Sequence, residues 1–260
     1  MERETGFEPA TLALARRCST AELFPRWIKR HVIFSIFPVL LSIVVAKNRD
    51  LTYNFPMNLI AIIDYGMGNL RSVEKAFEFV GHKAFIAKKP EEVSKASHVV
   101  LPGVGSFPEC MKNLTETGMI DAVYKSIESG KQFLGICLGL QLLFSESEEF
   151  GTHKGLDILQ GRVVRFNLGQ EFKVPHIGWN GITLKQDVRL LKDVPDNSYV
   201  YFVHSYYVVP SDKDIIATTS DYGGEFTSGV YKDNIFACQF HPEKSQDIGL
   251  RILKNFGDSK

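Results

Sequence analysis

The stretch FLGICLGLQLLF, residues 133–144, changes its hydrophobic period at a single cysteine. Up to Cys137, the segment QFLGIC is a short continuous apolar run, which is typical of a strand buried on both faces. After it, LGLQLLFSESEE has the pattern of a helix, so Cys137 is expected on the tight turn between the two. Gly135 and Gly139 carry no Cβ and keep that turn free of clashes. The stretch predicts a strand–turn–helix unit of an α/β fold.

The residues before this unit repeat the same alternation. Apolar runs predict strands within residues 58–64 and 83–88 and in SHVVLPGVGSF, where Pro102 and Gly103 end the strand. Residues 69–81 have apolar side chains at helical spacing, and a further helix is predicted around residues 109–129. Strands that alternate with helices in this way are typical of a parallel sheet covered by helices.

After Gly151 the pattern becomes richer in β-structure, and a last helix is predicted around residues 245–256. The predicted fold class is α/β, with a mostly parallel central sheet, helices on both faces and additional antiparallel strands. No linker interrupts residues 57–260, which are predicted to form one domain. The β-like segments are GRVVRFN (161–167), VPHIGWNGITL (174–184), SYVYFVHSYYVVP (198–210), DIIATTS (214–220) and TSGVYKDNIFACQFHP (227–242).

Residues 1–56 differ in character from the rest of the chain. Their apolar segment VIFSIFPVLLSIVVA is interrupted by Pro38 and is short for a membrane span, which takes about 20 residues. It also lies too far from the first residue for an ordinary signal peptide. We expect these residues to be an N-terminal extension outside the fold, with Met57 as a candidate start. A membrane anchor or targeting segment is the alternative, although no membrane association is expected.

The overall composition argues against several classes of protein. Lys plus Arg and Asp plus Glu are 30 each, so no basic excess indicates a nucleic-acid partner. The four cysteines have neither disulfide-scaffold density nor zinc-ligand spacing, which favours free thiols in the cytoplasm and no metal site. Gly66 and Gly68 follow the first strand, but a dinucleotide fingerprint would need a third glycine. No cofactor is therefore expected.

Cys137 has two interpretations. A cysteine at the carboxyl end of a strand and next to a helix N-terminus has the placement of a nucleophile elbow, where a thiolate is favoured and can attack acyl carbon. A buried and inert core cysteine would give the same local pattern. A catalytic thiol also requires a base and an oxyanion site elsewhere in the chain.

Both requirements have candidates. His241 stands at the end of the strand-like NIFACQF, and Glu243 is expected on the same side of extended backbone, where a carboxylate can orient an imidazole. A surface turn at HPE is the alternative. In LPGVGSF, the backbone amides of Gly103, Val104 and Gly105 are unobstructed and suit a developing negative charge, although an ordinary glycine turn would also explain the segment.

The motifs PGVG, GICLGLQ and HPE, in this order, resemble those of the class I (triad) glutamine amidotransferases. DYGMGNLRS, PHIGWN and YFVHSYY are further similar to the glutaminase subunits of imidazole glycerol phosphate synthases, which act in histidine biosynthesis. The resemblance covers essentially all of residues 57–260 and none of residues 1–56. Other class I glutaminases, or a catalytically silent binding module, remain as alternatives.

The resemblance implies roles for individual residues. Cys137 would attack the side-chain amide of glutamine, His241 would transfer protons, and Glu243 would orient His241. Leu138 would add its backbone amide to the oxyanion hole. Gln141 and Glu149, together with the backbone around His204, Ser205 and Tyr206, would hold the glutamine.

The resemblance also implies a partner. Glutaminases of this kind form a heterodimer with a cyclase subunit, which is a (β/α)8 barrel that receives the ammonia and makes imidazole glycerol phosphate and an aminoimidazole carboxamide ribotide. The chain has no room for a fused barrel, so the cyclase is expected to be a separate chain. Trp179, Tyr201 and Lys244 match positions at that interface, with ordinary surface as the alternative interpretation.

Overall fold

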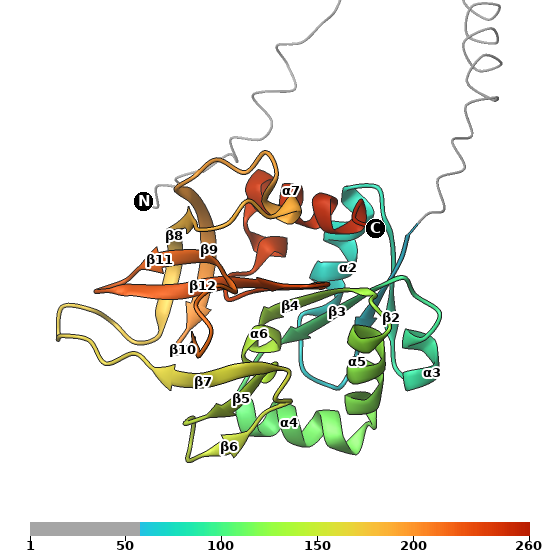
Figure 1. The fold of residues 1–260 in the computed structure, drawn as a ribbon, viewed down its shortest axis with the longest axis horizontal. Coiled ribbons are helices and arrows are strands. Elements are labelled where there is room, and N and C mark those ends of the chain that lie inside the picture. Colours follow the sequence, from blue (N-terminus) through green and yellow to red (C-terminus); the bar gives the residue numbers. More distant parts are fainter. Residues whose placement is uncertain (1–57) are drawn as a thin grey trace, which may run out of the picture. The chain divides into compact units, whose positions relative to one another are not determined.

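The computed structural model describes residues 58–260 (Figure 1), so the expectation that residues 1–56 form an extension lies outside the described residues. Within the described part, strands and short helices alternate up to Cys137, and strands predominate afterwards. The elements are β1 (Leu59–Ile63), α2 (Leu70–Phe79), β2 (Lys83–Ala87), α3 (Pro90–Val93), β3 (His98–Gly103), α4 (Phe107–Glu116), α5 (Met119–Glu128), β4 (Gln132–Cys137), α6 (Leu138–Leu142), β5 (Phe144–Ser147), β6 (His153–Lys154), β7 (Leu159–Arg165), β8 (His176–Leu184), η1 (Arg189–Leu191), β9 (Ser198–His204), β10 (Tyr206–Pro210), β11 (Ile216–Asp221), β12 (Glu225–Lys232), β13 (Ile235–Cys238), η2 (Pro242–Lys244) and α7 (Gln246–Gly257).

Five neighbouring strands form the parallel part of the sheet, in the order β2-β1-β3-β4-β13. β12 then pairs antiparallel with β13, and the sheet continues through β10, β7, β5 and β6. β8, β9 and β11 branch from β12 as further antiparallel strands. The predicted fold class is confirmed: an α/β sheet with a parallel centre and additional antiparallel strands.

The parallel strands bury side chains on both faces. In β1, Ile60 and Ile62 belong to one hydrophobic core and Ala61 and Ile63 to another, since alternate residues of a strand point to opposite faces. The first core includes apolar side chains of α2 and α7, and the second includes those of α4, α5 and α6. Figure 1 shows the same division, with α2 and α7 on one side of β1–β4 and α4–α6 on the other.

The register brings three strand ends to one edge of the sheet. Gly103 at the end of β3 lies opposite Cys137 at the end of β4. On the other side of β4, Cys238 at the end of β13 lies opposite Ile136. The segments that leave β3, β4 and β13 therefore start side by side, which is where a parallel sheet offers a binding crevice.

The helix predicted over residues 109–129 is in fact two helices. α4 ends at Glu116 and α5 begins at Met119, because Gly118 adopts a left-handed φ of 69° that no helix interior allows. Both helices bury apolar side chains in the same hydrophobic core.

The helix predicted over LGLQLLFSESEE was wrong beyond its first turn. α6 covers only Leu138–Leu142, and Phe144–Ser147 is strand β5, which pairs with β6 and β7. Leu142, Leu143 and Phe144 are all fully buried, so three consecutive residues must face the core. The Leu142 and Leu143 carbonyls accept the backbone N–H groups of Leu156 and Leu159, each at 2.9 Å, and Phe144 pairs with Leu159 in the sheet. These tertiary contacts outweigh the helical pattern.

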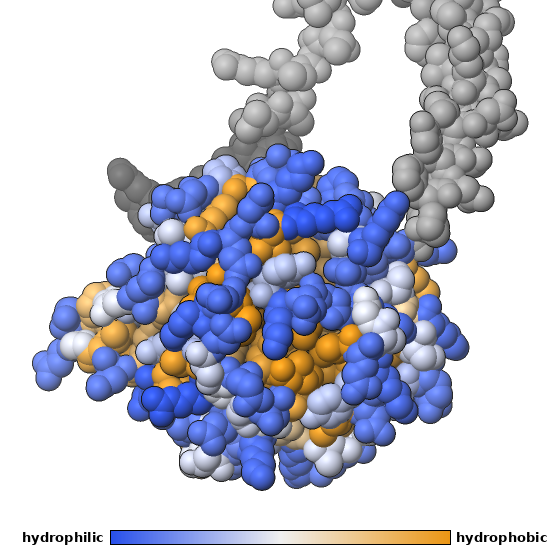
Figure 2. Space-filling model, in the orientation of Figure 1, coloured by the Kyte–Doolittle hydropathy of each residue, from blue (hydrophilic) through white to orange (hydrophobic). Residues whose placement is uncertain are grey.

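No helix within residues 58–260 is long and apolar enough to cross a membrane. Figure 2 shows hydrophilic residues over most of one face, with smaller groups of hydrophobic residues between them.

Candidate active site

Cys137 occupies a strained turn between β4 and α6. Its φ of 56° and ψ of −109° lie outside the usual regions for a residue with a side chain, and such conformations persist where the surrounding structure imposes them. The side chain is only 6% exposed. The predicted strand–turn–helix placement of Cys137 is confirmed, but α6 has only five residues. Because a helix dipole is a sum over aligned peptide units, a helix this short offers the sulfur limited stabilisation.

The glycines around this turn are required by close packing. A Cβ on Gly139 would overlap the carbonyl oxygen of Leu101. A Cβ on Gly103 would lie 2.7 Å from Cβ of Leu138 and 2.7 Å from the hydroxyl of Tyr65. Glycine therefore lets β3 approach the start of α6 closely, which brings the PGVG segment beside Cys137.

His241 and Glu243 form a buried pair. The two side chains are 3% and 1% exposed, and His241 Nδ1 lies 2.8 Å from Glu243 Oε1. The expected contact between them is present, although Pro242–Lys244 is a 3-10 turn rather than extended backbone. Since the carboxylate can only accept, Nδ1 carries the proton and Nε2 is left to act on other groups. Nε2 has no hydrogen-bond partner among the described residues.

The pKa of His241 is set by opposing effects. Burial alone would lower it, but the interactions with Cys137, and then with Glu243, outweigh burial and raise the pKa to about 10. Imidazolium is therefore the favoured form at neutral pH, and this form can give a proton to a leaving group.

Two buried side chains contact backbone carbonyls of the PGVG segment. The Tyr65 hydroxyl donates to the Pro102 carbonyl at 2.9 Å, and the Cys110 thiol lies 3.5 Å from the Val104 carbonyl. Gly105 has a φ of 99°, which glycine adopts readily. Val104, Gly105 and Leu138 line the same cavity as Cys137. Gly103 is not among the lining residues and lies opposite Cys137 in the sheet.

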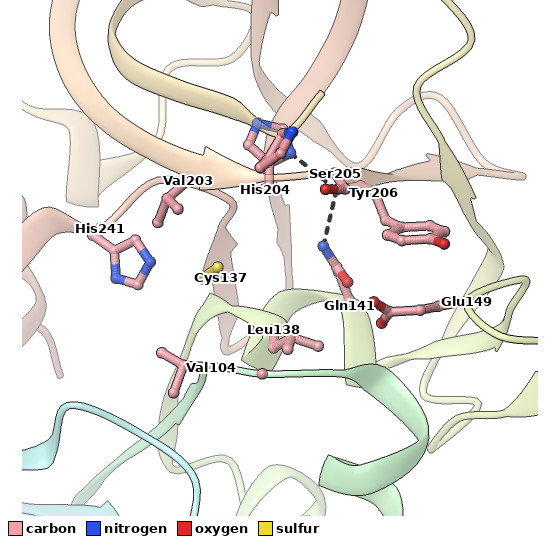
Figure 3. Close-up of a pocket in the computed structure, with 12 residues that line it drawn as sticks. Val104, Cys137, Leu138, Gln141, Glu149, Val203, His204, Ser205, Tyr206 and His241 are labelled. Atoms are coloured by element: carbon pink, nitrogen blue, oxygen red, sulfur yellow. Dashed lines mark hydrogen bonds between the residues drawn. The ribbon is translucent and has the colours of Figure 1, made fainter. Parts of the chain in front are cut away.

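A cavity of about 270 Å³ opens over Cys137 (Figure 3). This volume lies slightly below the range of about 300–1,000 Å³ typical of drug-sized ligands, and so suits a small metabolite. Figure 3 shows His241 facing Cys137 from one side and Gln141 and Glu149 on the other. The lining residues are Val104, Gly105, Cys137, Leu138, Gln141, Glu149, Pro175, Val203, His204, Ser205, Tyr206 and His241.

Gln141 and Glu149 turn oxygen atoms into this cavity. Gln141 Nε2 donates to the Tyr206 carbonyl at 3.0 Å, and the Gln141 oxygen points toward Glu149 in Figure 3. Glu149 Oε2 accepts the backbone N–H of Phe107 at 2.7 Å, which ties the carboxylate to the segment after PGVG. Two acceptor side chains on one wall provide a site for an ammonium group.

The predicted segment from His204 to Tyr206 lines the cavity next to Gln141. His204 Nδ1 lies 2.9 Å from the Tyr206 carbonyl, so this nitrogen donates and Nε2 accepts from His176 Nδ1 at 3.0 Å. Burial lowers the pKa of His204 to about 3 and that of His176 to about 4, so both rings are neutral at pH 7. The neutral pair fixes the backbone that borders the cavity.

Trp179, Tyr201 and Lys244 lie together outside the cavity. Trp179 and Tyr201 are paired across β8 and β9 with ring centroids 6.1 Å apart, and Lys244 Nζ is 5.8 Å from the Tyr201 ring centroid. Trp179 is 45% exposed, and its strand neighbours Ile177 and Tyr199 are 60% and 64% exposed. These exposed side chains have the composition of an interaction surface.

Gln239 is a further residue of the site that was not predicted from the sequence. Its side chain is fully buried between Gln141, at 2.9 Å from Nε2 to Oε1, and Cys137, at 3.6 Å from Nε2 to Sγ. A single polar residue within the apolar run IFACQF was the available signal, since a buried amide needs partners. Among residues 58–260, no three His, Cys, Asp or Glu side chains gather as metal ligands would.

Comparisons with known proteins agree on one family. Residues 61–259 match the model of the family "Glutamine amidotransferase class-I". The imidazole glycerol phosphate synthase subunit HisH of Syntrophotalea carbinolica is 56% identical, and the match covers 77% of this chain and 100% of that protein. The HisH protein of Geobacter sulfurreducens is 52% identical over 78% of this chain and 100% of its own length.

Solved structures show a similar fold at low sequence identity. The crystal structure of one glutamine amidotransferase is 20% identical with a TM-score of 0.60, covering 76% of this chain and 98% of that one. A glutamine amidotransferase from Thermotoga maritima is also 20% identical, with a TM-score of 0.53, covering 72% of this chain and 76% of that one.

Proposed function

The chain belongs to the glutamine amidotransferase class-I family. We propose that Cys137, His241 and Glu243 hydrolyse glutamine to glutamate and ammonia. The observation that carries the proposal is the arrangement around the cavity: a strained Cys137 faces His241, and His241 is held by a buried carboxylate. Nucleophile, base and orienting group thus occupy the roles of a catalytic triad.

In the first step, the Cys137 thiolate attacks the side-chain amide carbon of glutamine. The carbonyl oxygen becomes an oxyanion, and the backbone amides of the PGVG segment and Leu138 are the candidate donors to it. The C–N bond then breaks, His241 gives its Nε2 proton to the departing nitrogen, and ammonia leaves a glutamyl thioester on Cys137.

In the second step, His241 acts as a base. Its neutral Nε2 takes a proton from water, and the resulting hydroxide-like oxygen attacks the thioester carbon. The C–S bond breaks, glutamate is released and the thiolate is restored with His241 protonated. Glu243 keeps Nδ1 protonated throughout, so that Nε2 alone exchanges protons with the reacting groups.

The walls of the cavity account for the choice of glutamine. The oxygen atoms of Gln141 and Glu149 suit the α-ammonium group, and the segment from His204 to Tyr206 suits the amino-acid backbone. The side-chain amide of a glutamine held in this way would extend toward Cys137.

The ammonia serves a synthase, because the relatives are subunits of imidazole glycerol phosphate synthase. We infer that the partner is a cyclase subunit with a (β/α)8 barrel, and that Trp179, Tyr201 and Lys244 contact it. Residues 57–260 are proposed as the amidotransferase domain, acting in the cytoplasm without an organic cofactor.

Substitution of Cys137 by alanine tests this assignment in the full chain mixed with its cyclase partner and the ribotide substrate of that partner. Synthesis from glutamine should fall to background, while synthesis from added ammonium chloride should continue, because the cyclase chemistry lies on the other chain. Glutamine-dependent synthesis that survives in Cys137→Ala would refute the role of the thiol. Loss of ammonium-dependent synthesis would refute the division of labour between the two chains.

A further inference from the structure

Three amide and carbonyl groups form a hydrogen-bonded chain that ends at the nucleophile. The Tyr206 carbonyl accepts from Gln141 Nε2 at 3.0 Å, and the same nitrogen donates to Gln239 Oε1 at 2.9 Å. Gln239 Nε2 then lies 3.6 Å from Cys137 Sγ, a hydrogen-bond distance for an acceptor as large as sulfur. The chain connects the wall that borders the cavity to the reacting atom.

The direction of this chain is fixed by its first member. A backbone carbonyl can only accept, so Gln141 must turn its NH2 group toward Tyr206. The second hydrogen of that NH2 group points to Gln239, which must therefore present its oxygen. The NH2 group of Gln239 is consequently turned to the sulfur, and this orientation follows from the hydrogen bonds alone.

The same arrangement leaves one group of Gln141 available. Both hydrogens of its NH2 group are used within the protein, so its oxygen is the atom left for a ligand. Gln239 is fully buried, and its backbone N–H is also bound, to the Ser228 carbonyl at 2.8 Å. Its side chain therefore has little freedom to turn elsewhere.

On the basis of the proposed function, we propose that Gln239 is a positioning residue for Cys137: its amide donates a hydrogen bond that holds the sulfur in place and stabilises the thiolate. A hydrogen bond to a charged acceptor is stronger than one to a neutral acceptor, so the contact favours the thiolate over the thiol. This donor complements α6, whose five residues supply a limited helix dipole.

Two substitutions separate the roles of the amide. Gln239→Glu keeps an oxygen that accepts from Gln141 but replaces the donor to sulfur by a second acceptor. Gln239→Met is uncharged and similar in length, and it removes both hydrogen bonds. Gln170→Met, at an exposed position away from the cavity, is the matched control.

The measurement is the rate at which iodoacetamide alkylates Cys137 in the full chain as a function of pH, followed by mass spectrometry of the peptide that contains Cys137. The titratable groups that surround residue 239 are the same in every variant, but Gln239→Glu adds a carboxylate of its own beside the sulfur. Gln239→Met adds no charge, so its shift reports on the lost hydrogen bond alone. The surrounding titratable groups are His241, Glu243, Glu149, His204, Tyr206, Tyr65, Cys110 and Cys238.

Both variants should move the pH of half-maximal alkylation upward by about one unit, which is roughly a tenfold loss of reactivity at lower pH. Glutamine turnover with the partner should lose kcat in Gln239→Glu while KM stays within about twofold, because Gln141 keeps its acceptor. Gln239→Met should also raise KM. An unchanged alkylation profile in either folded variant overturns the proposal.

The alkylation measurement does not depend on glutaminase activity. A shift in a chain that hydrolyses no glutamine would keep the role of Gln239 and reject the proposed function. Hydrolysis by the wild-type chain with no shift in the variants would do the reverse. If the charge of Gln239→Glu prevents folding, Gln239→Met alone decides the question.

Discussion

At the scale of single residues, Glu243 and His241 depend on one another. Burial of an imidazole disfavours its charged form, yet the pKa of His241 is raised to about 10 because Cys137 and Glu243 outweigh that effect. The second carboxylate oxygen, Oε2, is buried with no hydrogen-bond partner in the described structure. Such an uncompensated acceptor is costly, and its retention fits a residue kept for chemistry.

Replacing Glu243 by glutamine should therefore impair catalysis more than folding. The amide has similar shape but no charge, and its NH2 group can donate to Nδ1 and impose the wrong tautomer on His241. We expect kcat for glutamine hydrolysis to fall by about 10²–10⁴-fold, by analogy with the loss of an orienting carboxylate in other triads. Steady-state kinetics with the partner present would measure this.

The matched control for this variant is Glu128→Gln at the exposed end of α5, which should keep wild-type kcat. The pH dependence gives a second readout: without the carboxylate, the pKa of His241 should fall from about 10. A Glu243→Gln chain with unaltered kcat would show that the buried pair is structural.

At the scale of elements, the crossing of β3 and α6 depends on the absence of a side chain at Gly139. A Cβ there would overlap the Leu101 carbonyl, and neither backbone can move without shifting the sheet or Cys137. We predict that Gly139→Ala lowers the free energy of unfolding by about 3 kcal/mol, the upper part of the usual cost of overpacking. Urea denaturation followed by circular dichroism would measure it.

Gly181→Ala in β8 is the control, because a Cβ there would come no closer than 3.6 Å to its nearest neighbour, the Asn197 carbonyl oxygen. Its effect should stay within about 1 kcal/mol. Equal stability of the two variants would mean that the contact between β3 and α6 adjusts freely, and the packing argument for this glycine would be wrong.

The local sequence pattern correctly predicted elements such as β4, in which nearly every residue is buried. β4 was placed at Gln132–Cys137 because the run after Gln132 is apolar and a glycine-flanked turn ends it. The residues after Leu142 were placed wrongly because consecutive apolar residues suit either a buried helix or a buried strand. Pairing of β5 with β7 decides between them, and that pairing involves residues far enough away that local spacing cannot reveal it.

Some contacts of the site could be predicted from the sequence and others could not. His241 and Glu243 are two residues apart, so their contact could be foreseen from the sequence, although a 3-10 turn brings them together. Gln239 lies 98 residues from Gln141 and 102 residues from Cys137 in sequence. The contacts of Gln239 with Gln141 and Cys137 depend on the register of β13 against β4 and on the position of α6. A sequence motif predicts neither of these.

At the scale of the whole molecule, three neutral histidines are buried in different parts of the structure. His98 of β3 lies against Ser259 near the end of the chain, with Nε2 3.2 Å from the Ser259 carbonyl, and burial lowers its pKa to about 4. His176 and His204 form the neutral pair behind the cavity, with pKa values of about 4 and about 3. Once the chain unfolds, all three take up a proton with a pKa of about 6.5.

From the lowered pKa values of these histidines, we predict that the free energy of unfolding begins to fall in acid before most carboxylates are protonated. Below about pH 6.5 the unfolded chain binds protons that the native structure rejects until pH 4 or lower, so stability falls as pH falls through that window. The slope should approach about 1.4 kcal/mol per pH unit for each histidine that stays neutral. His241 acts in the opposite direction: its raised pKa gives stability that is present below pH 6.5 and is lost as the pH rises through about 10.

Urea titrations of the full chain at several pH values between 4.5 and 7.5 (roughly one unit apart) would measure the slope. His98→Asn should reduce the slope even though it also lowers stability at neutral pH, because the slope counts protons and not contacts. His153→Asn in β6, which lies outside this buried set, should leave it unchanged. An acid slope that persists in full after His98→Asn would assign the lost stability to other groups, and would show that the buried end of the chain tolerates a charged His98.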